Sequence, residues 1–396
     1  MKGDAIILIP GIKGNQLIDT NTHNFHPIWR DMRFNFQRVQ DLEFTAEYDE
    51  QFYEEKIDTI VTNGPVESLA YKEFMEDIDS DLPKFYFSYD WRKSNRDNAK
   101  LLDDFIKMLI NKSKASHNAS TINKVNIVTH SMGNHICRFY INDFGFKSIH
   151  KVVFVAPPFL GSIAMVDAVI RGQGLFKNVK KKLRQIVRTF PGAVELFPTY
   201  EYAAVFNNGQ AVDFYNKDHW QAGIMRALQD TKETYEKRLA EKFVLNIEKA
   251  KKDMSDLENW MKDLSVEDRK RLLIIVRDEF KTDQAVKVNE EDPVTKNSID
   301  FREALVTEDG DGVVTHASSC CYHDSILTLA IEDSWRFDDD SHAFFMTEER
   351  VQQLVSWYFN DKETFDYHIP GNSIKRVTGL KKKTKKSLNY WKITKE

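Results

Sequence analysis

Short apolar runs alternate with amphipathic segments along most of the chain. Continuous apolar runs of strand length occupy residues 5–9, 85–89, 125–129, 152–156, 272–276 and 326–331. Apolar residues at helical spacing occupy 97–109, 132–144 and 347–359. Because strands that alternate with helices build a parallel sheet covered on both faces, the pattern predicts an α/β fold with a mostly parallel central sheet.

One long segment interrupts this alternation. From about residue 161 to residue 264, strand signals nearly vanish and charged helical stretches replace them. This change predicts a mainly helical cap inserted into the sheet. The expected organisation is a first part of the core at 1–160, a cap or lid insertion at 161–268, a second part of the core at 269–374 and a basic C-terminal tail at 375–396.

The apolar run at 125–129 ends in a serine, Ser131, followed by a small-residue turn and by helix-compatible sequence. This order indicates a nucleophile elbow, in which a tight strand-to-helix turn presents the serine hydroxyl at the sheet edge. The backbone N–H of the next residue, Met132, would then point at the reaction centre. Thr129 stands where the usual pattern has glycine, so the motif needs support from the rest of the chain.

A serine nucleophile requires a base and a carboxylate that orients the base. On folds with such an elbow, the acid and then the histidine follow the serine, at the ends of later strands. Residues 308–314 form an acidic turn with two glycines, and within it we choose Asp311 as the acid. Asp309 is the local rival. A calcium loop is a further alternative, although the remaining oxygen ligands are missing.

His342 is the candidate base because it stands just before the last predicted helix, where such folds present their histidine. His316 and His323 are closer to Asp311 in the sequence. That closeness brings no advantage, because a catalytic triad is assembled from separate strand ends.

Five motifs together carry a resemblance to a known family. They are 10–17 (PGIKGNQL), 89–92 (YDWR), 130–134 (HSMGN), 156–162 (APPFLGS) and 310–312 (GDG). In this combination the chain resembles the lecithin:cholesterol acyltransferase family, which comprises serine acyl hydrolases and acyltransferases that act on glycerophospholipids or related esters. The resemblance implies an α/β-hydrolase fold.

The resemblance also implies roles for individual residues. Ser131 would be the nucleophile, Asp311 the acid and His342 the base, while the backbone N–H groups of Ile12 and Met132 would form the oxyanion hole. Three further residues would line the substrate site or brace the surrounding loops: Gly11, Asp90 and Trp91. The implied chemistry requires no cofactor and no metal.

Composition bounds the location of the protein. Hydrophobic residues make up 41% and charged residues 30% of the chain, and no apolar run reaches the roughly eighteen residues that could span a bilayer. The apolar run near the N-terminus is too short for the core of a signal peptide. The three cysteines, Cys137, Cys320 and Cys321, cannot all pair with one another. We therefore expect a cytoplasmic protein in a reducing compartment, with possible peripheral association to membranes.

Positive charge gathers in two segments despite the net charge of -5. Residues 375–396 hold nine Lys or Arg against one Glu, interleaved with apolar and aromatic residues, and residues 171–190 are also rich in Lys and Arg. Both segments suit an anionic membrane surface. A solvated tail and a cap helix packed on its own domain are the alternatives. Nucleic acid is a less favoured partner.

The leading hypothesis is a serine acyl-ester hydrolase or acyltransferase that acts on lipid esters, like a phospholipase or lipase, through a covalent acyl-serine intermediate. A soluble carboxylesterase or thioesterase on the same fold is one alternative. A non-catalytic module that binds lipid or protein is another. The lipid class and the acyl acceptor stay open, because the expected cap, which would select them, carries none of the motifs beyond residue 162.

Overall fold

The structure is a computed structural model of the chain. It describes residues 4–19, 26–30, 42–44, 61–116, 121–172, 180–232, 234–277, 280–290, 298–307, 309–332, 342–361 and 374–378. The expected basic tail lies outside these residues beyond position 378, as do residues 173–179 of the expected basic helix.

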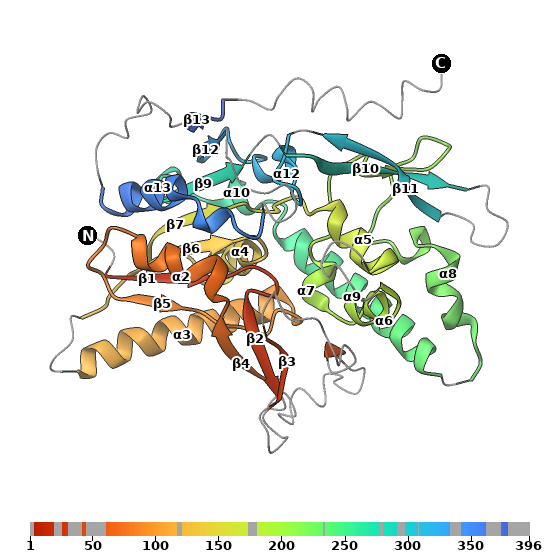
Figure 1. Ribbon diagram of the computed structural model, residues 1–396, viewed down its shortest axis with the longest axis horizontal. Helices are drawn as coiled ribbons and strands as arrows, with labels where there is room; N and C mark the ends of the chain where they lie inside the picture. The colour runs from red at the N-terminus through yellow and green to blue at the C-terminus, as the bar shows by residue number, and fades with distance from the viewer. Residues whose placement is uncertain are drawn as a thin grey trace.

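A seven-stranded sheet forms the centre of the molecule, in the order β13, β12, β9, β7, β6, β1, β5 (Figure 1). All its pairs are parallel except that of β12 with β13. The strands are β1 (Ala5–Ile9), β5 (Lys84–Tyr86), β6 (Val125–His130), β7 (Ile149–Val155), β9 (Leu272–Arg277), β12 (Leu327–Ile331) and β13 (Ile374–Arg376). The predicted α/β fold with a mostly parallel sheet is confirmed.

Strand β5 is shorter than the run 85–89 that predicts it. The chain leaves the strand after Tyr86, and Tyr89 turns toward the loop that follows β1. There the Tyr89 N–H donates to Asn15 Oδ1 at 3.3 Å, and its hydroxyl donates to the Pro10 carbonyl at 2.7 Å. The apolar residues at the end of the run therefore hold a loop rather than extend the sheet.

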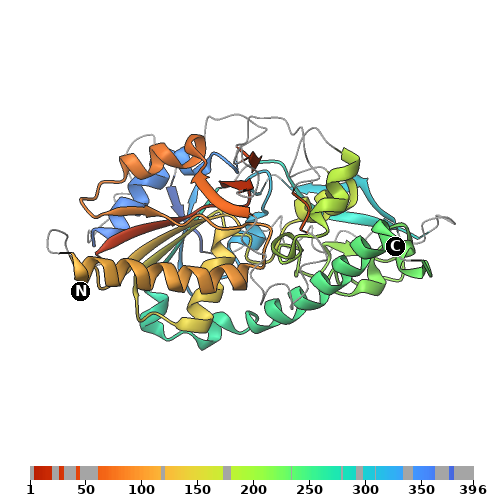
Figure 2. The same ribbon diagram turned by 90° about the horizontal axis from the view of Figure 1, so that it is seen from below.

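Helices cover both faces of the sheet (Figure 2). One face carries α3 (Asn95–Ala115) and α4 (Gly133–Phe144), and the other carries α2 (Ser68–Asp77) and α13 (Glu349–Phe359). Alternate residues of each strand point to opposite faces, so Ile7 and Ile127 join the first apolar layer while Leu8 and Val128 join the second. Strands β1, β6 and β9 are buried along their whole length, which explains their mostly apolar sequence.

A small antiparallel sheet follows β1 directly. It has the order β3, β2, β4, with β2 at Asn15–Asp19, β3 at His26–Trp29 and β4 at Val61–Val66. The loop between β1 and β2 holds Gly11 and Gly14, and the Gly14 N–H donates to the Gly11 carbonyl at 3.0 Å. This sheet therefore anchors the far side of a tight turn at the carboxyl end of β1.

The chain leaves the central sheet after β7 and returns at the neighbouring strand β9. We call residues 156–271 the inserted segment. Its elements are α5 (Ile163–Arg171), α6 (Lys180–Val187), α7 (Pro191–Val194), β8 (Ala204–Val205), η3 (Lys217–His219), α8 (Ala222–Met225), η4 (Arg226–Gln229), α9 (Tyr235–Asp256), α10 (Trp260–Asp263) and α11 (Val266–Arg269). Most of these helices lie beside the carboxyl edge of the sheet (Figure 1).

A third sheet joins the inserted segment to the chain that follows it. Its order is β11, β10, β8, with β10 at Thr282–Asn289 and β11 at Ser298–Thr307. Strands β10 and β11 were not predicted from the sequence. The remaining short elements are α12 (His316–Ser319) and η5 (Phe345–Thr347). The boundary at residue 268 stays a prediction, and pairing of β10 with β8 crosses it.

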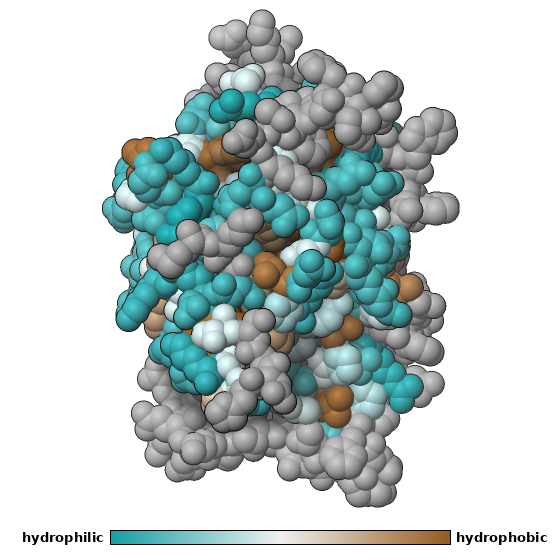
Figure 3. All heavy atoms as spheres, turned by 90° about the vertical axis from the view of Figure 1, so that its left-hand side faces the viewer, coloured by the Kyte–Doolittle hydropathy of each residue, from teal (hydrophilic) through white to brown (hydrophobic). Residues whose placement is uncertain are grey.

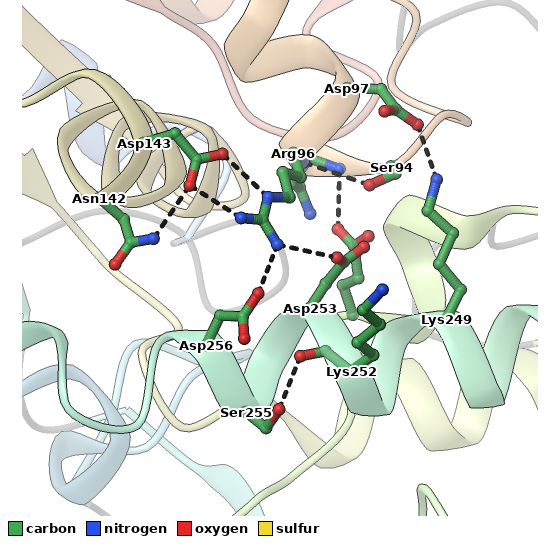
Figure 4. Close-up of polar contacts among 12 residues, drawn as sticks. Ser94, Arg96, Asp97, Asn142, Asp143, Lys249, Lys252, Asp253, Ser255 and Asp256 are labelled. Atoms are coloured by element: carbon green, nitrogen blue, oxygen red, sulfur yellow. Dashed lines mark hydrogen bonds and ion pairs between the residues drawn. The ribbon is translucent and has the colours of Figure 1, made fainter.

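Helix α9 also connects the inserted segment to the core, running along the same side of the sheet as α3 (Figure 2). Near the C-terminal end of α9, the Arg96 guanidinium of α3 binds three carboxylates (Figure 4). It contacts Asp253 at 3.3 Å and Asp256 at 2.5 Å on α9, and Asp143 of α4 at 2.8 Å. Lys249 of α9 pairs with Asp97 of α3 at 2.8 Å. We call this group the Arg96 cluster.

The face of the molecule opposite the inserted segment is mostly hydrophilic, with hydrophobic residues scattered over its coloured part (Figure 3). Within the described residues, no helix is long and apolar enough to cross a membrane. Two arginines of the predicted basic segment have partners within the protein: Arg171 pairs with Asp167, and Arg188 donates to the Val169 carbonyl at 3.0 Å. The free cysteines are Cys137, Cys320 and Cys321.

Candidate active site

Ser131 stands in a strained turn between β6 and α4. Its φ angle is 51°, in the left-handed region that a serine seldom adopts. The Ser131 N–H donates to the Val155 carbonyl at the end of the neighbouring strand, at a distance of 3.1 Å. The turn thus keeps the serine at the carboxyl edge of the sheet, as the predicted elbow requires.

Glycine is required two residues after the serine. A Cβ atom on Gly133 would lie 2.6 Å from the Ile9 carbonyl oxygen and 2.7 Å from that of Pro10. Any side chain would therefore force α4 away from β1 and displace the turn.

Thr129, which replaces the usual glycine, takes part in a brace across the turn. Its hydroxyl donates to Asn134 Oδ1 at 2.7 Å. The Asn134 amide in turn donates to the Ser131 carbonyl at 2.6 Å and to the Val155 carbonyl at 3.1 Å. The departure from the usual motif therefore adds a hydrogen bond that fixes the strained turn.

The structure brings Ser131, His342 and Asp311 together. His342 Nε2 lies 2.8 Å from Ser131 Oγ, and His342 Nδ1 lies 2.6 Å from Asp311 Oδ2. A carboxylate only accepts, so Nδ1 carries the proton and Nε2 is left to accept the serine hydroxyl. All three side chains are buried, and they come from three separate segments of the chain.

Asp311 is held by hydrogen bonds from its own turn. The N–H groups of Val313 and Val314 donate to Oδ1 at 2.9 and 2.7 Å, while Oδ2 faces His342. Burial alone would raise the pKa of Asp311, but the charge of His342 and these hydrogen bonds outweigh it and lower the pKa below its usual value. The carboxylate therefore stays ionised beneath the imidazole.

The rival residues take other positions. His342 bonds to Asp311 and not to Asp309, whose backbone carbonyl accepts from the His316 N–H at 2.9 Å. His323 Nδ1 lies 2.8 Å from the Cys320 carbonyl. Among the residues that the structure describes, no group of His, Cys, Asp and Glu is arranged to hold a metal ion.

Two backbone N–H groups are available for the predicted oxyanion hole. Within the described part of the chain, no hydrogen bond uses the N–H of Ile12 or of Met132. The loop that carries Ile12 lies close to the serine, because a Cβ atom on Gly11 would come within 2.9 Å of Ser131 Cβ. The Gly11 N–H itself donates to the Tyr71 hydroxyl at 2.9 Å and is therefore occupied.

The motif at 89–92 braces this loop. Trp91 is fully buried, and its indole N–H donates to the Asn15 carbonyl at 3.2 Å. Asp90 forms a buried ion pair with Arg92 at 2.7 Å. Burial would raise the pKa of Asp90, but the charge and hydrogen bonds of Arg92 lower it below its usual value. Trp91 therefore contacts the chain that follows β1, while Asp90 pairs within its own motif.

A known protein family matches more than half of the sequence. The family described as lecithin:cholesterol acyltransferase matches residues 83–324, which is more than half of the chain and includes Ser131 and Asp311. The chain belongs to the lecithin:cholesterol acyltransferase family. Gly11, Ile12 and His342 lie outside the matched range, so the structure and not the match brings them to the site.

A solved structure supports the same fold. The chain is similar to a protein in the Tle4–Tli4 complex, with 14% identity and a TM-score of 0.61, over 91% of this chain and 99% of that chain. A looser match is the mature lipase BlEst2 of Bacillus licheniformis, with 12% identity and a TM-score of 0.37, over 90% and 92% of the two chains. No curated protein matches the sequence significantly.

Membership of the lecithin:cholesterol acyltransferase family makes this chain an enzyme of the lipid-ester hydrolase and acyltransferase class. The sequence analysis assigned no role to two residues beside the triad, Tyr71 and His130. Tyr71 belongs to the apolar stripe of α2, which reads like any buried helix face. His130 lies in the motif at 130–134, and its position next to the serine was the one available signal.

Proposed function

We propose that this protein is a serine acyl-ester hydrolase or acyltransferase that acts on lipid esters, with Ser131 as nucleophile, His342 as general base and Asp311 as the orienting acid. The observation that carries the proposal is the His342 ring, which bridges Asp311 at 2.6 Å and Ser131 at 2.8 Å. The strained φ of Ser131 supports it further.

The first half of the reaction forms an acyl-enzyme. Ser131 Oγ attacks the ester carbonyl carbon while its proton passes to His342 Nε2. The resulting oxyanion is stabilised by the N–H groups of Ile12 and Met132. The carbon–oxygen bond to the alcohol then breaks, and the leaving alcohol takes the proton from His342. Asp311 stays ionised and stabilises the imidazolium.

The second half releases the acyl group. Water or a second alcohol attacks the acyl-serine carbonyl and gives its proton to His342. When the tetrahedral intermediate collapses, that proton returns to Ser131 Oγ. Water as acceptor gives hydrolysis, and an alcohol gives transacylation. Phospholipase or lysophospholipase activity is our preferred specialisation, with the inserted segment as the cap that selects the acyl chain and head group.

The proposal includes contact with anionic lipid through the basic segments at 171–190 and 375–396. Each Lys or Arg near such a surface contributes about 1 kcal/mol. Because β13 ends at Arg376, deleting residues 379–396 would spare the sheet. The deletion should weaken binding to anionic liposomes at low salt. Unchanged binding would remove the tail from the proposal.

The first test compares wild type with Ser131→Ala by mass-spectrometric product analysis. The substrates are phospholipid, diacylglycerol and short esters, each with and without a long-chain alcohol. Serine-dependent release or transfer of a fatty acyl group from one lipid class supports the proposal and names the substrate. Turnover of monomeric short esters alone favours the soluble esterase or thioesterase. If a fluorophosphonate probe fails to label Ser131 in the folded protein, the result favours the non-catalytic binding module.

A further inference from the structure

A series of buried hydrogen bonds connects the loop that carries Gly11 and Ile12, here called the oxyanion loop, to the segment that carries His342. The Gly11 N–H donates to the Tyr71 hydroxyl oxygen at 2.9 Å. Tyr71 Oη lies 2.8 Å from His130 Nδ1, and His130 Nε2 lies 3.1 Å from the backbone carbonyl of His342. Four separate segments of the chain therefore meet through two side chains whose hydrogen bonds reach no reacting atom.

The donors and acceptors fix the position of each proton in this series of hydrogen bonds. The His342 carbonyl only accepts, so His130 Nε2 must carry a proton and donate it. Burial lowers the pKa of His130 to about 3, with a further contribution from the charge of His342. The ring is therefore neutral, and Nδ1 is left as an acceptor. The Tyr71 hydroxyl donates to it while accepting from Gly11, so the direction of the chain is unique.

Packing leaves these groups no freedom to rearrange. Tyr71 and His130 are 3% and 2% exposed, and their rings meet edge to face with centroids 5.7 Å apart. The His130 and His342 rings lie 5.2 Å apart. Helix α2, which carries Tyr71, packs against η5 and α13, the elements that directly follow His342. The helix that carries Tyr71 therefore packs against the same elements that hold the segment of His342.

We propose that Tyr71 and His130 are positioning residues that fix the oxyanion loop and the backbone of the general base relative to Ser131. The inference rests on the proposed function, because it assigns these residues a task in that reaction. Neither residue transfers a proton. His130 holds the His342 carbonyl, and Tyr71 holds both His130 and the Gly11 N–H.

The expected effect follows from the geometry of the attack. Reacting groups must be held close to their productive positions, and a displacement of about 1 Å can cost about 100-fold in rate. Tyr71→Phe keeps the ring and its packing but removes both hydrogen bonds. It should lower kcat by about 10- to 100-fold. KM should change by less than about twofold, because neither residue contacts substrate.

Tyr358→Phe is the matched control. Tyr358 is also buried in the apolar layer that contains Tyr71, and its hydroxyl donates to the Lys270 carbonyl at 3.0 Å. This substitution likewise deletes one buried hydroxyl, but it does so far from the triad. Its kcat should stay within about twofold of wild type. If the two variants lose the same activity, the proposal is wrong, because the loss then reports general stability.

Two substitutions of His130 separate the halves of the chain. A glutamine amide can reach the position of Nε2 and donate to the His342 carbonyl, whereas an asparagine amide can reach only the position of Nδ1, beside Tyr71. His130→Gln should therefore keep about tenfold more kcat than His130→Asn. Equal activity of the two variants, or a higher activity of His130→Asn, would overturn the assignment of His130.

The readouts also separate this inference from the proposed function. Variants are assayed below their melting temperatures for ester turnover and for the rate at which a fluorophosphonate labels Ser131. If wild type shows no activity beyond that of Ser131→Ala, the proposed function fails. If wild type is active but Tyr71→Phe labels and turns over like Tyr358→Phe, the positioning role alone fails. If Tyr71→Phe does not fold, the comparison of the two His130 variants decides.

Discussion

Asp311 and Asp309 are two aspartates of one turn with different environments. Asp311→Asn removes the charge that fixes the proton on His342 Nδ1. It should lower kcat by about 10⁴-fold, the loss seen for the equivalent change in a serine-protease triad. Asp309→Asn should lower kcat by less than about tenfold. Steady-state kinetics on the substrate found for wild type would check both, and reversed effects would transfer the role to Asp309.

Two buried histidines make the stability of the fold sensitive to acid. Burial lowers the pKa values of His130 and His135 to about 3, whereas an unfolded histidine has a pKa of about 6.5. Between these values the unfolded chain binds more protons, so the free energy of unfolding should fall as the pH is lowered from 6.5. Each histidine contributes up to about 1.4 kcal/mol per pH unit. Urea unfolding at pH 7, 6 and 5 measures the slope.

His135→Gln provides the control for that slope. His135 Nε2 bonds to the Pro158 carbonyl at 2.9 Å, so the substitution should lower stability at every pH. Glutamine takes up no proton, and the fall in stability between pH 6.5 and pH 5 should become shallower. A slope identical to that of wild type would contradict the role assigned to this histidine.

At the scale of elements, the contact between α3 and α7 depends on one buried carboxyl group. Glu195, just after α7, accepts a hydrogen bond from the Asn95 N–H at the start of α3 at 2.7 Å. Burial raises the pKa of Glu195 to about 7, although hydrogen bonds from Asn95 and Ser94 oppose the shift. Between pH 4.5 and pH 7 the folded chain binds more protons at Glu195 than the unfolded chain does. The free energy of unfolding therefore falls as the pH rises through this range.

Glu195→Gln should therefore gain stability relative to wild type on going from pH 5 to pH 8, by up to about 3 kcal/mol. Urea unfolding at the two pH values measures the difference. Glu248→Gln, in an exposed ion pair on α9, should change stability by less than about 0.5 kcal/mol at both. A constant difference between Glu195→Gln and wild type would show that this carboxyl group does not titrate in the range.

The elements that could be predicted from the sequence are those with a strong pattern of their own. Strands β1, β6, β7 and β9 are buried over most of their length, and each contains the apolar run that predicts it. Strand β10 alternates buried and half-buried residues over a polar sequence, so its pattern is weak. It forms because β8 and β11 offer partners, and this tertiary contact leaves no local signal.

The candidate site divides in the same way. Ser131 and Asp311 could be chosen because each stands in a turn of distinctive composition, and His342 because it precedes the last predicted helix; their order along the chain fits one fold. Tyr71 could not, because its hydroxyl acts through a partner 59 positions away. A buried tyrosine in an apolar helix stripe has no sequence mark that separates a structural role from a positioning one.

At the scale of the whole molecule, the Arg96 cluster ties the inserted segment to the core (Figure 4). Arg96→Met keeps the aliphatic stem but leaves Asp143, Asp253 and Asp256 without this cation. The Arg96 side chain is 25% exposed, so solvent screens part of the effect. We expect a loss of about 2 kcal/mol in the free energy of unfolding and faster amide exchange in the last turns of α9.

Hydrogen–deuterium exchange and urea unfolding would test this attachment. Lys217→Met, which removes a 3.5 Å ion pair between exposed side chains on η3 and α9, should cost less than about 0.5 kcal/mol. If both variants behave alike, the Arg96 cluster is an ordinary surface network. The inserted segment would then owe its position to apolar packing alone.

Helix α9 has a consequence for how this enzyme can acquire new substrates. Phe243 packs against Phe197 and Trp220 within the inserted segment, while Asp253 and Asp256 of the same helix hold the core. Its 22 residues span about 33 Å without a break. One residue added between the two ends would turn one half by about 100° against the other. Loops around α9 are free to change in length by single residues. Helix α9 cannot gain or lose a single residue without rotating one of its two contact regions away from its partners.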